Sequence, residues 1–129
     1  VFEGRRLLVV HVDVRNIFAL TSALEQKGAV VIIGRNGREA IERLNEFEDI
    51  DLVLMDVMMP EMDGFEATTL IRKEARWRKL PIIAVTAKAM KDDQERCLQA
   101  GANDYLAKPI DLDRLFSLIR VWLPKMERI

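Results

Sequence analysis

The chain has few cysteines and none of the long apolar runs that are typical of membrane-spanning proteins. Its 129 residues include one cysteine, Cys97, so no internal disulfide can form and a reducing compartment is expected. Apolar runs are far shorter than the roughly 20 residues that cross a bilayer, and no signal peptide opens the chain. We therefore expect a cytoplasmic domain without a membrane segment of its own. Because Val1 stands where an initiator methionine would be, the sequence favours a fragment of a longer protein.

The chain also lacks an excess of charge of either sign. The sequence has 20 lysines and arginines and 21 aspartates and glutamates, which gives a net charge of -1. This balance argues against a nucleic-acid partner bound through a basic face. One basic cluster is interpreted instead as the solvated end of a helix, near the negative end of its dipole. Its members are Arg72, Lys73, Arg76, Arg78 and Lys79.

Short apolar runs and helical spacings alternate along the chain. The apolar runs lie at 7–10, 30–33, 52–55, 82–85 and, more weakly, 105–106. Between them, residues three and four positions apart predict helices at 17–24, 40–47, 65–71, 90–100 and 112–123. Gly28 and Gly101 are placed to end the first and fourth helices, and Pro124 closes the fifth.

This alternation predicts an α/β fold with a parallel sheet and helices on both faces. For five strands we expect a flavodoxin-like, doubly wound sheet in the order 2-1-3-4-5. The length allows one domain, which we place at 1–129 with a core of about 5–124. In such a sheet, ligands bind beyond the carboxyl ends of the strands.

Chemically active side chains follow four of the expected strands. The strand ends read His11-Val12-Asp13, Asp56, Thr86-Ala87 and Lys108-Pro109. A carboxylate facing an ammonium and a hydroxyl suits phosphoryl transfer: Asp56 attacks, and Lys108 and Thr86 bind the phosphoryl oxygens. The alternative for Asp56 by itself is an aspartate that only begins a turn.

Three motifs carry a family resemblance that spans essentially the whole chain. They are LVLMDVMMPEMDG at 52–64, IIAVTA at 82–87 and AGANDYLAKPI at 100–110. In this order and spacing the chain resembles a response-regulator receiver domain of bacterial two-component systems. The segment VRNIFAL at 14–20 makes it most similar to receivers of hybrid sensor histidine kinases.

The resemblance assigns roles at the phosphorylation site. It implies that Asp56 is the phosphoacceptor, charged by a phosphohistidine on a histidine kinase or a histidine phosphotransfer domain. Lys108 pairs with the phosphoryl group, and Thr86 and Ala87 occupy the phosphoryl-binding and switch positions. The bond before Pro109 is expected to be cis, which proline makes tolerable. Such a domain is a substrate of a kinase more than a turnover enzyme.

The resemblance also implies a surface that responds to phosphorylation. Tyr105 is the aromatic residue expected to rotate and report the change on the face formed by the fourth helix, the fifth strand and the fifth helix. Leu118 and Val121 lie off the main apolar stripe of the fifth helix. They are candidates for kinase docking or for a homodimer contact.

The chain departs from the family at the magnesium site. Receivers normally carry two adjacent acids after the first strand, where this sequence has His11 and Val12. Asp56 and the main-chain carbonyl of Met58 remain as Mg²⁺ ligands, and Asp13 is one place too far along. Imidazole suits zinc, copper or nickel better than Mg²⁺.

Three interpretations of this departure stay open. In the first, phosphotransfer persists with weakened Mg²⁺ binding, by at least the roughly 10- to 100-fold that loss of a second-shell partner costs. In the second, the chain is a phosphorylation-impaired pseudo-receiver that serves as a protein–protein interaction module. In the third, His11 joins Asp56, with or without Asp13, in a transition-metal site. An engineered substitution would leave the same sequence.

Overall fold

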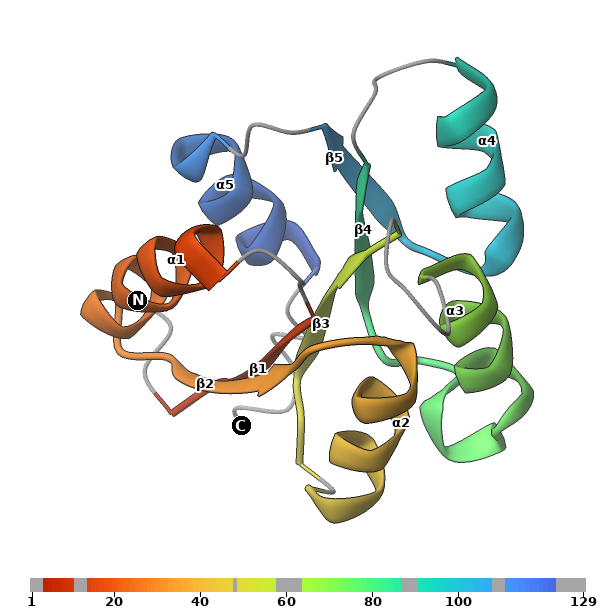
Figure 1. The fold of residues 1–129 in the computed structure, drawn as a ribbon, viewed down its shortest axis with the longest axis horizontal. Helices are drawn as coiled ribbons and strands as arrows, with labels where there is room; N and C mark the ends of the chain where they lie inside the picture. The colour runs from red at the N-terminus through yellow and green to blue at the C-terminus, as the bar shows by residue number, and fades with distance from the viewer. Residues whose placement is uncertain are drawn as a thin grey trace.

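All five expected strands and all five expected helices are present in the computed structural model, which describes residues 4–10, 14–47, 49–57, 64–86, 91–107 and 111–122 (Figure 1). The strands are β1 (Arg6–Val10), β2 (Val30–Gly34), β3 (Leu52–Asp56), β4 (Ile82–Thr86) and β5 (Asp104–Ala107). The helices are α1 (Val14–Gln26), α2 (Gly37–Glu46), α3 (Gly64–Lys73), α4 (Lys91–Ala100) and α5 (Leu112–Trp122), with a short 3-10 helix, η1, at Ala75–Trp77. The expected end of the fifth helix at Pro124 lies outside the described residues.

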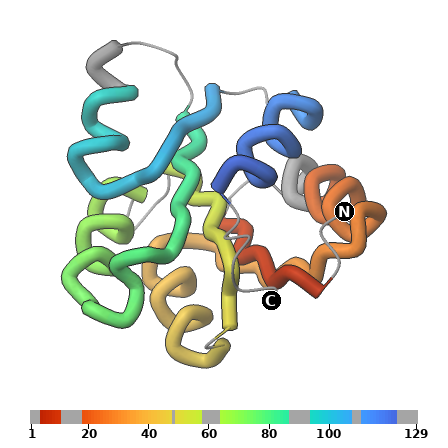
Figure 2. Tube along the Cα trace, turned by 180° about the vertical axis from the view of Figure 1, so that it is seen from behind, coloured from red at the N-terminus to blue at the C-terminus, as the bar shows by residue number. Residues whose placement is uncertain are grey.

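The strands form one parallel sheet in the order β2-β1-β3-β4-β5, which confirms the expected topology. Helices α1 and α5 cover one face, and α2, α3 and α4 cover the other (Figures 1 and 2). Each face therefore has its own hydrophobic core. The central strand β3 supplies both cores, because successive side chains of a strand point to opposite faces. Leu52 and Leu54 enter one core, and Val53 and Met55 enter the other.

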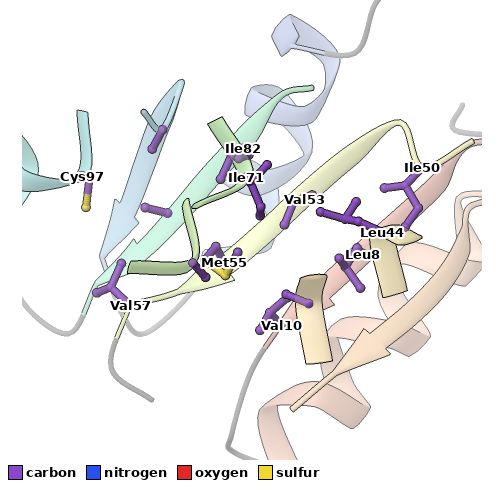
Figure 3. Close-up of a cluster of buried hydrophobic side chains, with 14 residues drawn as sticks. Leu8, Val10, Leu44, Ile50, Val53, Met55, Val57, Ile71, Ile82 and Cys97 are labelled. Atoms are coloured by element: carbon purple, nitrogen blue, oxygen red, sulfur yellow. The ribbon is translucent and has the colours of Figure 1, made fainter. Parts of the chain in front are cut away.

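The core under α2, α3 and α4 is drawn in Figure 3, where Leu44, Ile71 and Cys97 come from the three helices. Cys97 is 1% exposed, as expected for a thiol on the inner face of its helix. The opposite core is built on Leu20 and Leu24 from α1 and on residues of α5. Leu112, which opens the apolar stripe of α5, is 38% exposed, because the first turn of that helix extends beyond the core.

The helix ends follow from local chemistry. Gly28 and Gly101 adopt φ angles of 93° and 117°, in the left-handed region that glycine tolerates, and each follows the helix that it was expected to end. At the start of α2, the side chain of Asn36 accepts a hydrogen bond of 2.9 Å from the amide of Glu39. The Glu39 carboxylate in turn accepts one of 2.9 Å from the amide of Arg35.

Strand β2 forms one edge of the sheet. The amide of Val30 donates to Arg5 in the chain leading into β1, so the polar groups of Val31 and Ile33 face the free side of the edge. The Arg43 side chain of α2 donates from Nε to the carbonyl of Ile33, at 3.2 Å. Arg43 also pairs with Glu46 at 2.6 Å, which holds it against the edge.

The expectation that the basic cluster is solvated is wrong for Arg72, whose side chain turns inward. Its guanidinium donates hydrogen bonds of 2.8 Å to the carbonyls of Gly101 and Trp77 and one of 3.2 Å to the carbonyl of Arg78. A fourth, of 2.8 Å, goes to the Asn103 side chain, which also accepts from the amide of Ile82 at 2.9 Å. Burial lowers the pKa of the Arg72 guanidinium below its ordinary value. Arg72 therefore ties α3 to the first residue of β4 and to the turn before β5.

Candidate functional site

Asp56 is the last residue of β3 and is completely buried, at 0% exposure. It lies opposite Val85 of β4, and the amide of Val57 donates to the Val85 carbonyl at 3.0 Å. Burial of a carboxylate is costly in free energy unless the surroundings compensate the charge, so buried carboxylates are found preferentially at functional sites. The structure thus places the expected acid at the carboxyl edge of the sheet.

Thr86 ends the neighbouring strand β4 and is 2% exposed. Because Asp56 is paired with Val85, Thr86 follows one residue later on the adjacent strand, at a spacing of about 4.8 Å between strands. Thr86 is itself opposite Ala107, the last residue of β5. The structure therefore brings Asp56 and Thr86 to the same edge, as the sequence predicted.

The remaining predicted site residues continue from this edge. Ala107 leads directly to Lys108, and Val10, paired with Met55 of β3, leads to His11. Seven predicted members of the site lie outside the described residues: His11, Val12, Asp13, Met58, Ala87, Lys108 and Pro109. Among the residues that the structure does describe, no three histidine, cysteine, aspartate or glutamate side chains gather to hold a metal ion.

Gly64, the first residue of α3, presses directly against the site. Its amide donates to the carbonyl of Val57 at 3.3 Å. A Cβ atom at Gly64 would lie 2.5 Å from the Asp56 carbonyl oxygen and 2.6 Å from the Val57 Cα. Only glycine allows this approach of helix to strand. Sequence reasoning gave Gly64 no role beyond its place at the end of the motif at 52–64.

Tyr105 of β5 lies on the predicted face between α4 and α5. Its hydroxyl donates a 3.0 Å hydrogen bond to Oε1 of Gln94 in α4. A hollow of about 350 Å³ opens beside this pair, and Asp111 and Arg114 of the α5 end form its far side. Sequence reasoning predicted Tyr105 here but missed Gln94, because nothing in the local sequence pairs this glutamine with Tyr105.

The two apolar residues that lay off the main stripe of α5 differ in exposure. Leu118 is partly buried and packs against the core between α1 and α5. Val121 is 68% exposed, so it remains available for contact with another molecule. At the end of the helix, Trp122 donates from Nε1 to Asp104 at 3.1 Å, which joins α5 to β5.

Of the helices that the structure describes, none combines the length and the apolar character that a membrane crossing requires.

Sequence comparison identifies relatives along nearly the whole chain. The model of the response regulator receiver domain matches residues 7–120. The chain is 39% identical over 118 residues to the hybrid signal transduction protein dokA of Dictyostelium discoideum. This alignment covers 91% of this chain but 7% of dokA. It is 36% identical to the polar-differentiation response regulator DivK of Brucella anthropi, where the alignment covers 92% of this chain and 96% of DivK.

Solved structures give the same relationship. The receiver domain of the sensor histidine kinase PA1611 of Pseudomonas aeruginosa, solved with a magnesium ion in its active-site cleft, superimposes with a TM-score of 0.85 at 37% identity. That match covers 92% of this chain and 97% of the other. A chain in the Saccharomyces cerevisiae co-crystal of the phosphotransfer protein Ypd1 with the Ssk1 receiver gives 0.87 at 30% identity, over 95% and 90% of the two chains. With its sheet order, its buried Asp56 and these relatives, the chain belongs to the family of response regulator receiver domains of two-component signalling.

Proposed function

We propose that this chain is the receiver of a phosphorelay and accepts a phosphoryl group on Asp56 from a phosphohistidine. The single observation that carries the proposal is the burial of Asp56 beside Thr86 at the carboxyl edge of the sheet. The donor is a histidine kinase or a histidine phosphotransfer domain, in line with a relative in a histidine kinase and with the Ssk1 receiver solved in complex with Ypd1. The chain spans 7 to 12% of the first signalling proteins that it matches, two of which are histidine kinases by name, and we propose that it serves as one cytoplasmic module of such a protein.

The chemistry follows from the residues at the edge. A carboxylate oxygen of Asp56 attacks phosphorus, the bond from phosphorus to the donor histidine nitrogen breaks, and the imidazole leaves with the electron pair. The Thr86 hydroxyl donates a hydrogen bond to a phosphoryl oxygen, and the Lys108 ammonium offsets the added negative charge. Asp56 and Thr86 stand on adjacent buried strands, so little side-chain freedom is lost when they act together.

The donor set for Mg²⁺ is partial. The Asp56 carboxylate is a hard oxygen ligand of the kind that Mg²⁺ prefers, and the Met58 carbonyl supplies a further oxygen. His11 and Val12 supply none, so we propose that Mg²⁺ binds with weakened affinity. When bound, this ion neutralises charge on the oxygens of the transferring group.

Phosphorylation is proposed to change the face between α4, β5 and α5. Movement of Thr86 toward the phosphoryl group alters the space beside β5, and Tyr105 then exchanges its bond with Gln94 for a more buried position. The partner that reads this face is the kinase, the phosphotransfer domain or a second copy of the chain. The exposed Val121 at the end of α5 suits a homodimer contact.

A second candidate rests on His11 and Val12. If the loss of two acids abolishes Mg²⁺-dependent phosphorylation, the chain is a pseudo-receiver whose α4–β5–α5 face docks a partner without a covalent switch. Both candidates share the fold and the docking face, and they differ in the chemistry of Asp56.

Acetyl phosphate, a small phosphoryl donor, separates the two candidates. Incubation with this donor and excess Mg²⁺ is expected to add the mass of one phosphoryl group to the intact protein. The Asp56→Asn variant is the matched control and should gain none. The double variant His11→Asp/Val12→Asp should be phosphorylated at lower Mg²⁺ concentration. No adduct on the original chain, together with an adduct on the double variant, would establish the pseudo-receiver.

A further inference from the structure

A groove between α2 and α3 lies away from both the phosphorylation edge and the α4–β5–α5 face. The two helices run side by side over the same face of the sheet (Figures 1 and 2). The groove has a volume of about 340 Å³ and opens at the carboxyl end of α3, where η1 follows. Nothing in the proposed phosphotransfer uses this region.

The walls of the groove are apolar and firmly supported. Ile41 of α2, Leu70 of α3 and Trp77 of η1 line it, and each is partly exposed. Ile41 and Trp77 also pack against the buried core beneath, so their positions are fixed from below. A volume of this size accepts one or two side chains, which is the scale of an anchor in a peptide-binding site.

The rim of the groove carries a net positive charge. Lys73 and Arg76 line the groove together with one acid, Glu74, and Arg78 and Lys79 follow as exposed cations in the same segment. The negative pole of a helix amounts to about half a charge, so these cations exceed what the α3 dipole can balance. Within the described part of the chain, Glu74 pairs with Arg76 at 3.7 Å, and no ion pair is made by Lys73, Arg78 or Lys79.

Arg76 is held in place over the groove. Its guanidinium lies 4.2 Å from the centre of the Trp77 ring and donates a hydrogen bond to the Asn45 side chain on α2. This arrangement spans the groove from η1 to α2 and orders a cation in advance of binding. Tryptophan and arginine are the residues most enriched among those that dominate binding energy at protein interfaces.

We propose that this groove docks an acidic segment of a partner protein that also carries an aliphatic or aromatic side chain. The apolar side chain inserts between Ile41, Leu70 and Trp77, and the carboxylates pair with Lys73 and Arg76. A single-stranded RNA is the less suitable occupant, because Arg76 already covers the indole face on which a base would stack. The inference is independent of phosphorylation at Asp56.

The two tryptophans provide an internal control for the test. Nuclear magnetic resonance of the wild-type chain should resolve the indole N–H of Trp77 in the groove from that of Trp122 on α5, which donates to Asp104 of β5. Titration with a synthetic peptide of alternating glutamate and leucine should shift the Trp77 signal in a saturable way and leave the Trp122 signal in place. The Asp56→Asn variant should bind the peptide equally well.

Charge reversal gives the matched comparison. Lys73→Glu, in the last turn of α3, is expected to weaken the peptide roughly tenfold. Arg120→Glu makes the same change in the last turn of α5 and should leave the affinity unchanged. The proposal is overturned if Trp77 does not respond, if a peptide of glutamates alone binds as tightly, or if both reversals weaken binding equally. Tighter binding of oligouridylate, or closure of the groove by self-association in sedimentation, would also overturn it.

Discussion

Gly64 brings the first turn of α3 against the backbone of Asp56, so the size of one side chain sets how closely this helix approaches the site. The nearest atoms to an added Cβ are backbone atoms of residues 56 and 57, which cannot rotate away. Arg72 fixes the opposite end of the same helix through four hydrogen bonds to two different segments, η1 with the residue after it and the turn before β5. Single residues thus anchor both ends of α3, one beside the site and one at the amino edge of the sheet.

Gly64→Ala is expected to destabilise the protein by about 1 to 3 kcal/mol, the usual cost of overpacking a tight contact. Urea unfolding measures this loss. Gly34→Ala is the graded control, because its Cβ would lie 3.3 Å from the nearest atom, the amide nitrogen of Ala40, and should cost less. Equal stability of the two variants would show that α3 can withdraw from Asp56 without penalty.

Arg72→Met should lower the free energy of unfolding by about 2 kcal/mol or more, since it leaves the carbonyls of Gly101 and Trp77 without their donor. Arg72→Lys should recover only part of the loss, because an ammonium cannot span the same acceptors. The neighbouring exposed Lys73→Ala should stay within about 0.5 kcal/mol of the original chain. If Lys73→Ala cost as much as Arg72→Met, the stabilising role would belong to the charge of the segment as a whole.

At the scale of elements, the ends of helices were the features that the sequence predicted best. Gly28 and Gly101 were expected to stop α1 and α4 and do so, because the left-handed turn that they make is a local property. The inward turn of Arg72 could not be predicted from the sequence, because its acceptors at Gly101 and Asn103 lie about thirty positions away along the chain. The bond from Tyr105 of β5 to Gln94 of α4 was also missed, because it joins two separate elements.

The start of α2 gives a prediction that depends on pH. The hydrogen bond from the Arg35 amide lowers the pKa of Glu39 below its ordinary value of 4.5, so the ionised form is favoured in the folded state. Its stabilising contribution is therefore complete above that value and is lost as the pH falls through the lower pKa of the folded state. Glu39→Gln should flatten this part of the stability profile, and Asn36→Ala should cost about 1 kcal/mol at neutral pH. Chemical denaturation across the acid range measures both effects, and an unchanged acid slope in Glu39→Gln would remove Glu39 as its source.

At the scale of the whole molecule, two cores on opposite faces share one central strand. The topology was predictable because short apolar runs alternate with helical spacings, and few arrangements accommodate that pattern. The buried edge that holds Asp56 and Thr86 followed from the topology. The placement of Lys108 opposite Asp56 remains a prediction from the topology and the resemblance. The groove between α2 and α3 was not foreseen, because its walls come from two helices and its rim had been read as an ordinary helix end.

Thermal unfolding links the metal site to global stability, because any ligand of the native state raises the midpoint. Mg²⁺ is expected to raise the midpoint more for His11→Asp/Val12→Asp than for the original chain. Without metal, the double variant should melt at a lower temperature, since crowded carboxylates repel. Zinc or nickel should leave the original chain nearly unchanged. A rise that His11→Asn abolishes would instead make His11 a transition-metal ligand.

The contact of Arg43 with the carbonyl of Ile33 has a consequence for how this protein behaves among its own copies. An open parallel sheet offers its outermost strand as a template on which a foreign strand can grow. A guanidinium seated on that margin occupies an acceptor that an incoming chain would need, and its charge repels another copy of itself. Arg43 is therefore expected to hinder edge-to-edge pairing of β2 between copies of this chain.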